Sequence, residues 1–376
     1  MVHLILVCSA CQTEFAAEAK AWRCAKCKRF LKLRPRTPFT SKAIIEDDHS
    51  LWRYRAMLPV NSDTRIVTMG EGMTPLVEAT FAEQQIHFKL EYVSPTGSFK
   101  DRGTTVLVTK LLEWGIKNAG DDSSGNAGAS LAAYCAHAGI AADIFTPSSA
   151  SPTKLAQIEI FGATLWKIDG PREAATTEIE EAVEAGKMTY ATHAWSPFVY
   201  EGTKTVAYEI WEQLGRRAPD WFVSPVGQGS LFLGAYRGFK DLLAAGEISH
   251  MPRMLAVQSD RCAPIVEAIT LNLMTHAEIE KRQSIAEGIA LAHPIHDREI
   301  LEAVRKTGGN AIAISDEDVE SAQHLLAETG FYVEPTSAVV GAALEKLRPQ
   351  GIVVAALTGS GMKSPIRPRS PRPVAT

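Results

Sequence analysis

Two α/β domains, each a doubly wound three-layer structure, are predicted for this chain, together with a small N-terminal cysteine knuckle. From Phe81 onward, short apolar runs alternate with helical runs, an order that calls for mostly parallel sheets covered by helices. The chain has 376 residues, too many for one compact sheet. Four cysteines are grouped near its start. We therefore expect two α/β domains with a cleft between them.

The individual elements follow from the same periodicity. Strands are predicted at 88–93, 142–146, 164–168, 188–192, 221–225, 254–258, 311–314 and 351–357. Helices are predicted at 105–114, 127–138, 153–161, 173–185, 203–214, 231–243, 317–329 and 337–347. The run 118–122 has the position of a central strand but is unusually polar for one. We expect a knuckle at 1–35, a large domain from 36–104 and 205–365, a small domain at 105–204, and a disordered tail at 366–376, where prolines alternate with arginines.

Composition narrows the class of protein. The chain is 45% hydrophobic and 22% charged, as in ordinary soluble proteins, and its net charge of -4 gives no reason to expect nucleic acid or an acidic membrane as a partner. No apolar run approaches the roughly 18 residues of a membrane helix. The apolar start, residues 4–7, lacks the features of a signal peptide. A cytoplasmic protein is expected.

The cysteines form two C-x-x-C pairs, Cys8 with Cys11 and Cys24 with Cys27, separated by twelve residues. Four thiolates at this spacing can bind one tetrahedral structural zinc ion, which would stabilise a segment too short to bury a core. A redox pair is the alternative for such motifs. The basic residues around the second pair also raise the possibility of a nucleic-acid-binding ribbon, but no aromatic array accompanies them.

The stretch 94–103 places Lys100 in the first turn of a predicted helix, directly after a strand. A lysine at such a turn can lose its proton and form a Schiff base. The alternative is a surface lysine paired with Asp101.

Three further turns lie where a predicted strand ends or a helix begins, the positions at which α/β proteins bind ligands. The turn 123–128 offers helix-start amides, two hydroxyls and Asn126 to a carboxylate or phenolic oxygen. The turn 225–231 carries Gly227 and Gly229 and suits a phosphate monoester, since no P-loop lysine follows. The turn 357–361 carries Thr358, whose hydroxyl can hydrogen-bond a ring nitrogen. Together with Lys100, these turns describe a site for pyridoxal phosphate (PLP).

The motifs Gly70–Leu76, Pro95–Gly103 and Leu357–Lys363 resemble those of the fold type II PLP enzymes, and within them the threonine synthase family. The resemblance runs from about residue 50 to 365, and the cysteine knuckle also occurs in that family. It implies that Lys100 is the catalytic Schiff-base lysine. It implies cofactor contacts from Phe99, Lys100, Asn126, Val226, Gly227, Gln228, Gly229, Ser230, Leu231 and Thr358. It implies substrate contacts from Ser123, Ser124, Asn126, Ala127, Lys204 and Thr205, and a homodimer.

The substrate is less closely specified. The family's activity would convert O-phosphohomoserine and water to threonine and phosphate by γ-elimination and β-hydration. However, the asparagine and arginine that precede the family's Glu-Gly-x-Lys-Thr motif are missing before Glu201. The segment 286–290 instead resembles serine and threonine ammonia-lyases. A lyase that eliminates or replaces at Cβ is therefore the second hypothesis, and a zinc-ribbon binding protein with a vestigial PLP domain is the third.

Overall fold

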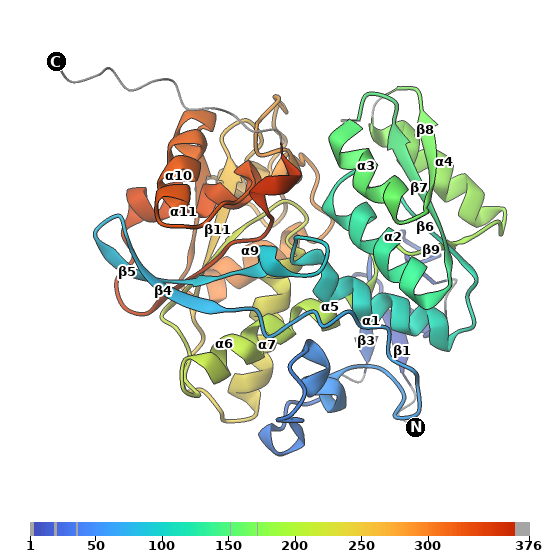
Figure 1. The fold of residues 1–376 in the computed structure, drawn as a ribbon, viewed down its shortest axis with the longest axis horizontal. Coiled ribbons are helices and arrows are strands. Elements are labelled where there is room, and N and C mark those ends of the chain that lie inside the picture. The colour runs from blue at the N-terminus through green and yellow to red at the C-terminus, as the bar shows by residue number, and fades with distance from the viewer. Residues whose placement is uncertain (1–3, 19–20, 35–36, 151, 171, 365–376) are drawn as a thin grey trace.

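Two lobes, each a sheet with helices on both faces, stand side by side in the computed structural model of this protein (Figure 1). The structure describes residues 4–18, 21–34, 37–150, 152–170 and 172–364. The tail predicted to be disordered, 366–376, lies outside the described residues. Within the described part, no helix is both long and apolar enough to cross a membrane.

The larger lobe is built on a six-stranded sheet with the order β12-β11-β10-β13-β5-β4, in which only β4 is antiparallel to its neighbour. Its strands are β4 (Leu76–Phe81), β5 (Gln84–Lys89), β10 (Trp221–Pro225), β11 (Arg253–Ser259), β12 (Asn310–Ile314) and β13 (Val353–Ala356). Successive residues face opposite sides, so Phe222 packs into one hydrophobic cluster and Val223 into another.

Helices cover both faces of this sheet. On the face of Phe222 lie α6 (Thr205–Gln213), α7 (Ser230–Ala244), α8 (Pro264–Thr270) and α9 (Asp297–Lys306). On the face of Val223 lie α10 (Asp316–Glu328) and α11 (Pro335–Leu347). The predicted helices in this lobe did not include α8 or α9.

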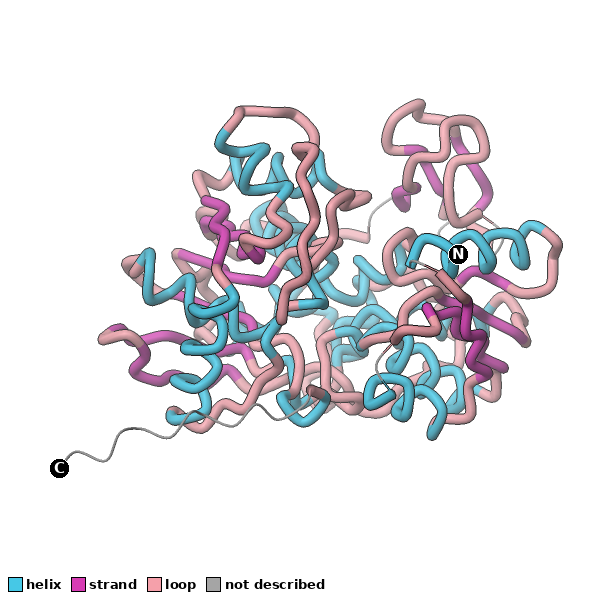
Figure 2. The backbone as a smooth tube through the Cα atoms, turned by 90° about the horizontal axis from the view of Figure 1, so that it is seen from above, coloured by secondary structure: helices cyan, strands magenta, loops and turns pink. Residues whose placement is uncertain are grey.

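The smaller lobe has a four-stranded parallel sheet with the order β8-β7-β6-β9. Its strands are β6 (Asn118–Asp121), β7 (Ala141–Pro147), β8 (Thr164–Ile168) and β9 (Thr189–Tyr190). Helices α2 (Asn126–Ala138) and α3 (Pro152–Ile160) cover one face and α4 (Arg172–Glu184) the other. Figure 2 shows the two lobes from above. The α/β class is thus confirmed, whereas the exact domain boundaries stay a prediction.

Two helices join the lobes. α1 (Lys100–Glu113) packs along both α2 and α5 (Pro197–Thr203). The approach of α1 to α5 is so close that a Cβ at Gly202 would lie 1.9 Å from the carbonyl oxygen of Arg102. Glycine is therefore required at 202, and it fixes the helix that begins with Lys100.

The N-terminal segment forms a three-stranded antiparallel sheet with the order β2-β1-β3. Its strands are β1 (Ile5–Cys8), β2 (Glu14–Ala16) and β3 (Leu31–Arg34). Arg23 forms an ion pair with Glu180 of α4 at 2.9 Å, and the Phe30 ring lies 4.1 Å from that of His296, which directly precedes α9. This knuckle therefore contacts both lobes.

Candidate active site

A cavity of ≈ 200 Å³ lies at the carboxyl ends of the strands in both lobes. Of the residues predicted from the sequence, its walls include Phe99, Lys100, Ser123, Ser124, Asn126, Ala127, Gly227, Gln228, Gly229, Ser230, Leu231 and Thr358. Val226 does not line it; its amide and carbonyl are hydrogen-bonded to Val257 and Gln258 in the core. The four turns, far apart in the sequence, thus meet at one place.

Lys100 is the first residue of α1, and its Nζ lies 4.8 Å from the centre of the Phe99 ring. Burial lowers the pKa of this lysine to about 8, against an opposing effect of the Asp121 carboxylate. Within the described part of the chain, Nζ makes no salt bridge or hydrogen bond. A substantial neutral fraction of the amine near neutral pH is what a Schiff-base nucleophile needs.

The alternative interpretation of Lys100, a surface lysine paired with Asp101, is not what the structure has. The Asp101 carboxylate accepts hydrogen bonds from the amide and hydroxyl of Thr96, at 2.7 and 2.6 Å, and from the Ser130 hydroxyl at 2.6 Å. Burial raises the pKa of Asp101 to about 6. Asp101 therefore fixes the turn before α1 and leaves Lys100 available to the cavity.

Thr358 follows β13 and is held by its backbone. Its amide donates to Ser337 Oγ at 2.8 Å, and its carbonyl accepts from the Phe99 amide at 3.0 Å. Its side-chain Oγ1 is buried and has no hydrogen-bond partner among the described residues. A buried unpaired hydroxyl at a cavity wall fits the ring nitrogen of the predicted cofactor.

The loop between β10 and α7 is shaped for an anion. Gly229 adopts a φ of +77° and caps α7, whose first-turn amides lack partners within the helix. A Cβ at Gly227 would lie 3.0 Å from Ile289 Cα, so only glycine lets this loop pack against the opposite wall. Gln228 Oε1 accepts from the amide of Ile295 at 3.0 Å. This side chain is thus engaged by the segment before α9, and the loop offers backbone amides to a phosphate.

Asn126 begins α2 in the smaller lobe and meets the larger lobe across the cavity. Its Nδ2 donates to Glu334 Oε1 at 2.9 Å, and Glu334 directly precedes α11. A Cβ at Gly128 would lie 1.9 Å from the Ser123 carbonyl, which explains the glycine there. The turn thus holds Ser123, Ser124 and Ala127 at the cavity wall.

Three polar residues of the cavity wall were missed by the sequence analysis: Arg172, His193 and Glu334. His193 follows β9, and its Nδ1 lies 2.9 Å from Asp121 Oδ2 at the end of β6. This pair explains the unusually polar strand, because Asp121 is buried as the partner of a cavity residue. Arg172 opens α4 shortly after β8. Arg172 and His193 follow strand ends, a position rule that could have found them.

Lys204 and Thr205 need a correction, since neither lines the cavity. The Lys204 ammonium is buried and pairs with Glu201 Oε2 at 2.6 Å. The Thr205 hydroxyl donates to the Gly202 carbonyl and accepts from Arg102 at 3.2 Å. The Glu-Gly-x-Lys-Thr motif therefore packs α5 and α6 against α1 in this chain.

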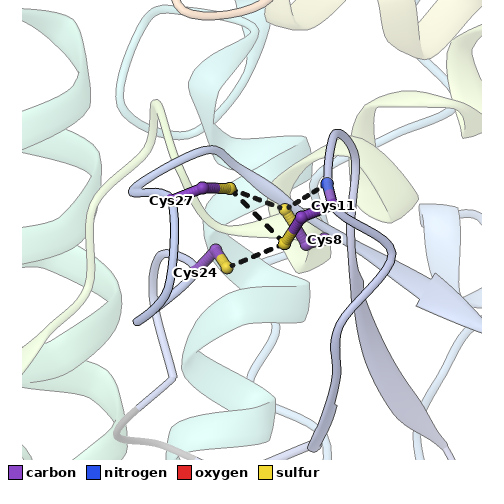
Figure 3. A group of neighbouring side chains, drawn as sticks. All are labelled: Cys8, Cys11, Cys24 and Cys27. Atoms are coloured by element: carbon purple, nitrogen blue, oxygen red, sulfur yellow. Dashed lines mark hydrogen bonds between the residues drawn. The ribbon is translucent and has the colours of Figure 1, made fainter.

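The four cysteines of the knuckle converge (Figure 3). Sγ of Cys27 lies 3.3 Å from that of Cys8 and 3.5 Å from that of Cys11, and Sγ of Cys11 lies 3.6 Å from that of Cys24. All four thiols are free. Hydrogen bonds from the hydroxyl and backbone of Thr13 lower the pKa of Cys11 to about 6. The donor set therefore suits a tetrahedral metal ion.

Comparison with known proteins gives one family. The model of the family described as pyridoxal-phosphate dependent enzyme matches residues 67–359. The threonine synthase of Methanocaldococcus jannaschii is 37% identical over 328 residues, covering 84% of this chain and 81% of the relative. That of Methanosarcina acetivorans is 33% identical over 381 residues, covering 97% and 93%.

Solved structures share the fold at lower identity. A maize serine racemase superposes with a TM-score of 0.67 at 21% identity, covering 77% of this chain and 88% of its own. A threonine deaminase from T.th. gives 0.67 at 23%, covering 80% and 94%.

Proposed function

Because the chain belongs to the family of pyridoxal-phosphate-dependent enzymes, we propose that it is a threonine synthase that converts O-phosphohomoserine and water to threonine and phosphate. Threonine synthases that match over most of their length and of this chain support this substrate. The observation that carries the proposal is the unpaired Lys100 amine in a cavity bordered by the N-terminal ends of α2 and α7.

The residues at the cavity fit pyridoxal phosphate. The amides at the start of α7 would hold its phosphate, the Thr358 hydroxyl its ring nitrogen, and Phe99 would lie near its ring. The Asn126 amide would reach its phenolic oxygen. A neutral hydroxyl does not keep the ring nitrogen protonated as a carboxylate would, which favours elimination and replacement over transamination.

Each wall has a distinct task in the reaction. Bound pyridoxal phosphate supplies an electron sink for the loss of a proton from the substrate's Cα. Lys100 Nζ, with its lowered pKa, accepts that proton and can return one later, as base and then acid. The amides at the start of α2, with Ser123 and Ser124, bind and orient the substrate carboxylate. Enclosure by both lobes keeps bulk water from the reacting atoms.

Arg172 and His193 would bind the phosphate group of the substrate. They take over a role that the sequence analysis gave to Lys204 and Thr205, whose side chains are directed into the core. A guanidinium matches the geometry of a phosphate, and Asp121 orients the His193 ring through its Nδ1. Both residues come from the smaller lobe, on the same side as the amides for the carboxylate.

The test is a product assay on the purified protein loaded with cofactor. O-phosphohomoserine should yield threonine and phosphate in equal amounts. A protein that takes up no pyridoxal phosphate would overturn both enzyme proposals.

A lyase acting on threonine or serine remains the second candidate. The segment that resembles the ammonia-lyases, with Glu287, Gly288 and Ile289, lines the cavity opposite the phosphate loop. Release of ammonia and a 2-oxoacid from threonine or serine, without turnover of O-phosphohomoserine, would select this candidate.

For the knuckle we propose one structural zinc ion bound by Cys8, Cys11, Cys24 and Cys27. A homodimer in the cytoplasm is proposed from the family resemblance. Metal analysis and the molar mass in solution test these two proposals.

A further inference from the structure

A second group of metal-binding side chains lies outside both the cavity and the knuckle. His276, Glu278 and His293 belong to the segment between α8 and α9, and their ligand atoms lie within 4.8 Å of one another. His276 Nε2 is 3.2 Å from His293 Nδ1 and 3.7 Å from Glu278 Oε1. Two nitrogens bound at about 2.1 Å to one ion lie about 3.0–3.4 Å apart in octahedral or tetrahedral geometry. The spacing therefore fits a shared ion.

The orientation of His276 supports a ligand role. Asp297, at the start of α9, accepts a hydrogen bond from the backbone amide of His276 at 3.0 Å and lies 2.7 Å from its Nδ1. A carboxylate on Nδ1 fixes the tautomer that leaves the Nε2 lone pair free, the arrangement found behind metal-binding histidines. Nε2 is the atom that faces His293 and Glu278. Two imidazoles and a carboxylate suit a divalent ion such as Zn²⁺ or Ni²⁺.

The position of the group in the chain gives such an ion a structural effect. Residues 277–292 lie between the two histidines, and within them Glu287–Leu291 line the active-site cavity. The regular structure in this segment is the short 3-10 turn Glu287–Ile289. An ion shared by His276 and His293 would close the base of this loop.

We propose that His276, Glu278 and His293 bind a divalent transition-metal ion that fastens the loop forming one wall of the cavity. The alternative is a hydrogen bond between the two imidazoles with no ion. The proposal does not depend on which amino acid is the substrate.

The test is calorimetric titration of Ni²⁺ into the full-length, tag-free protein that has been loaded with pyridoxal phosphate and zinc and freed of excess metal. Ni²⁺ is the probe because it prefers nitrogen ligands and leaves zinc thiolates largely intact. One ion per chain should bind saturably. His293→Ala and Glu278→Gln should weaken binding about tenfold or more. His137→Ala removes an exposed histidine elsewhere and should leave binding unchanged.

A second measurement guards against a change in fold. His293 is 66% exposed, so His293→Ala should keep the stability of the parent protein. Ni²⁺ should slow proteolysis within 277–292 in the parent and not in His293→Ala. Absence of saturable binding, or equal binding by His293→Ala, overturns the proposal.

Discussion

The backbone amide of Phe99 donates to the carbonyl oxygen of Thr358 at 3.0 Å, so the turn that carries the lysine and the turn that carries the threonine are built as one unit. Ser98 and Gly359 form a β-bridge beside it, and the Ser360 amide donates to Gly97 at 3.0 Å. The Thr358 backbone thus positions the lysine helix, while its side chain is left for a ligand.

The Thr358 hydroxyl can be tested without disturbing this backbone contact. Thr358→Val should raise the dissociation constant of pyridoxal phosphate about 10–100-fold, because a buried polar atom loses its partner at a cost of about 1–3 kcal/mol. Thr358→Ser keeps the hydroxyl and should stay within a few fold of the parent. Equilibrium titration followed by cofactor absorbance measures both. Equal affinities for the valine and serine variants would contradict the role.

Lys100 should give cofactor attachment a distinctive pH dependence. Burial lowers the pKa of Lys100 to about 8, so the neutral amine should increase about tenfold per pH unit below that value and level off above it. The rate of covalent attachment to apoenzyme should follow the same curve, measured by borohydride trapping and peptide mass spectrometry. Lys100→Arg should trap nothing at this position. A rate that keeps rising to about pH 10, the ordinary range of a lysine, would contradict a lowered pKa.

Arg172→Gln should raise the KM for O-phosphohomoserine about 10–100-fold, since a hydrogen bond to a charged group contributes about 1.5–3 kcal/mol. Cofactor affinity should not change, because the α7 loop holds that phosphate. Lys167→Gln removes an exposed positive charge from β8 of the same lobe and serves as the control. An unchanged KM in Arg172→Gln would move the substrate phosphate elsewhere.

Glu209 anchors a buried ionic network under α1. Its carboxylate pairs with Arg102 and, at 2.8 Å, with Lys89. Glu209→Gln should lower the free energy of unfolding by about 3–5 kcal/mol, because two buried cations lose their counter-charge. Glu302→Gln, which breaks an exposed pair with Lys306, should cost less than about 1 kcal/mol.

The same network predicts acid sensitivity. Although burial alone would raise it, Arg102 and Lys89 lower the pKa of Glu209 from an ordinary 4.5 to about 2. The stabilisation is therefore complete above pH 4.5 and is lost as the pH falls toward 2. Denaturant unfolding across this range should show a steeper loss in the parent than in Glu209→Gln. Parallel curves would contradict the lowered pKa.

Removal of the metal from the knuckle should loosen the N-terminal segment. Cys11→Ser, or prolonged chelation of the parent, should release the bound zinc and make residues 4–34 sensitive to protease, since this short sheet has little core of its own. Cys262→Ser changes a buried cysteine of the larger lobe and should keep the zinc. Zinc retained at one ion per chain in Cys11→Ser would contradict a four-cysteine site.

Local patterns predicted the turns at Lys100, Asn126, Gly227 and Thr358, because glycine and capping residues between a strand and a helix are visible in the sequence. They could not predict Glu334 at the cavity, since its place depends on how α11 packs beside β13. Lys204 shows the converse: a motif that suggested binding is used here for packing. The polar strand β6 became intelligible only when β9 placed His193 against Asp121.

The knuckle has a mechanical consequence. Arg23 fastens it to α4 of one lobe, and Phe30 rests on His296 of the other. His296 Nε2 in turn lies 3.1 Å from the carbonyl of Ala194, the residue after His193. Any motion that parts the lobes must stretch this strap or break one of its two ends. The amplitude of cleft breathing is therefore limited by the stiffness of a short ribbon, and metal supply becomes a setting of how widely the enzyme can open.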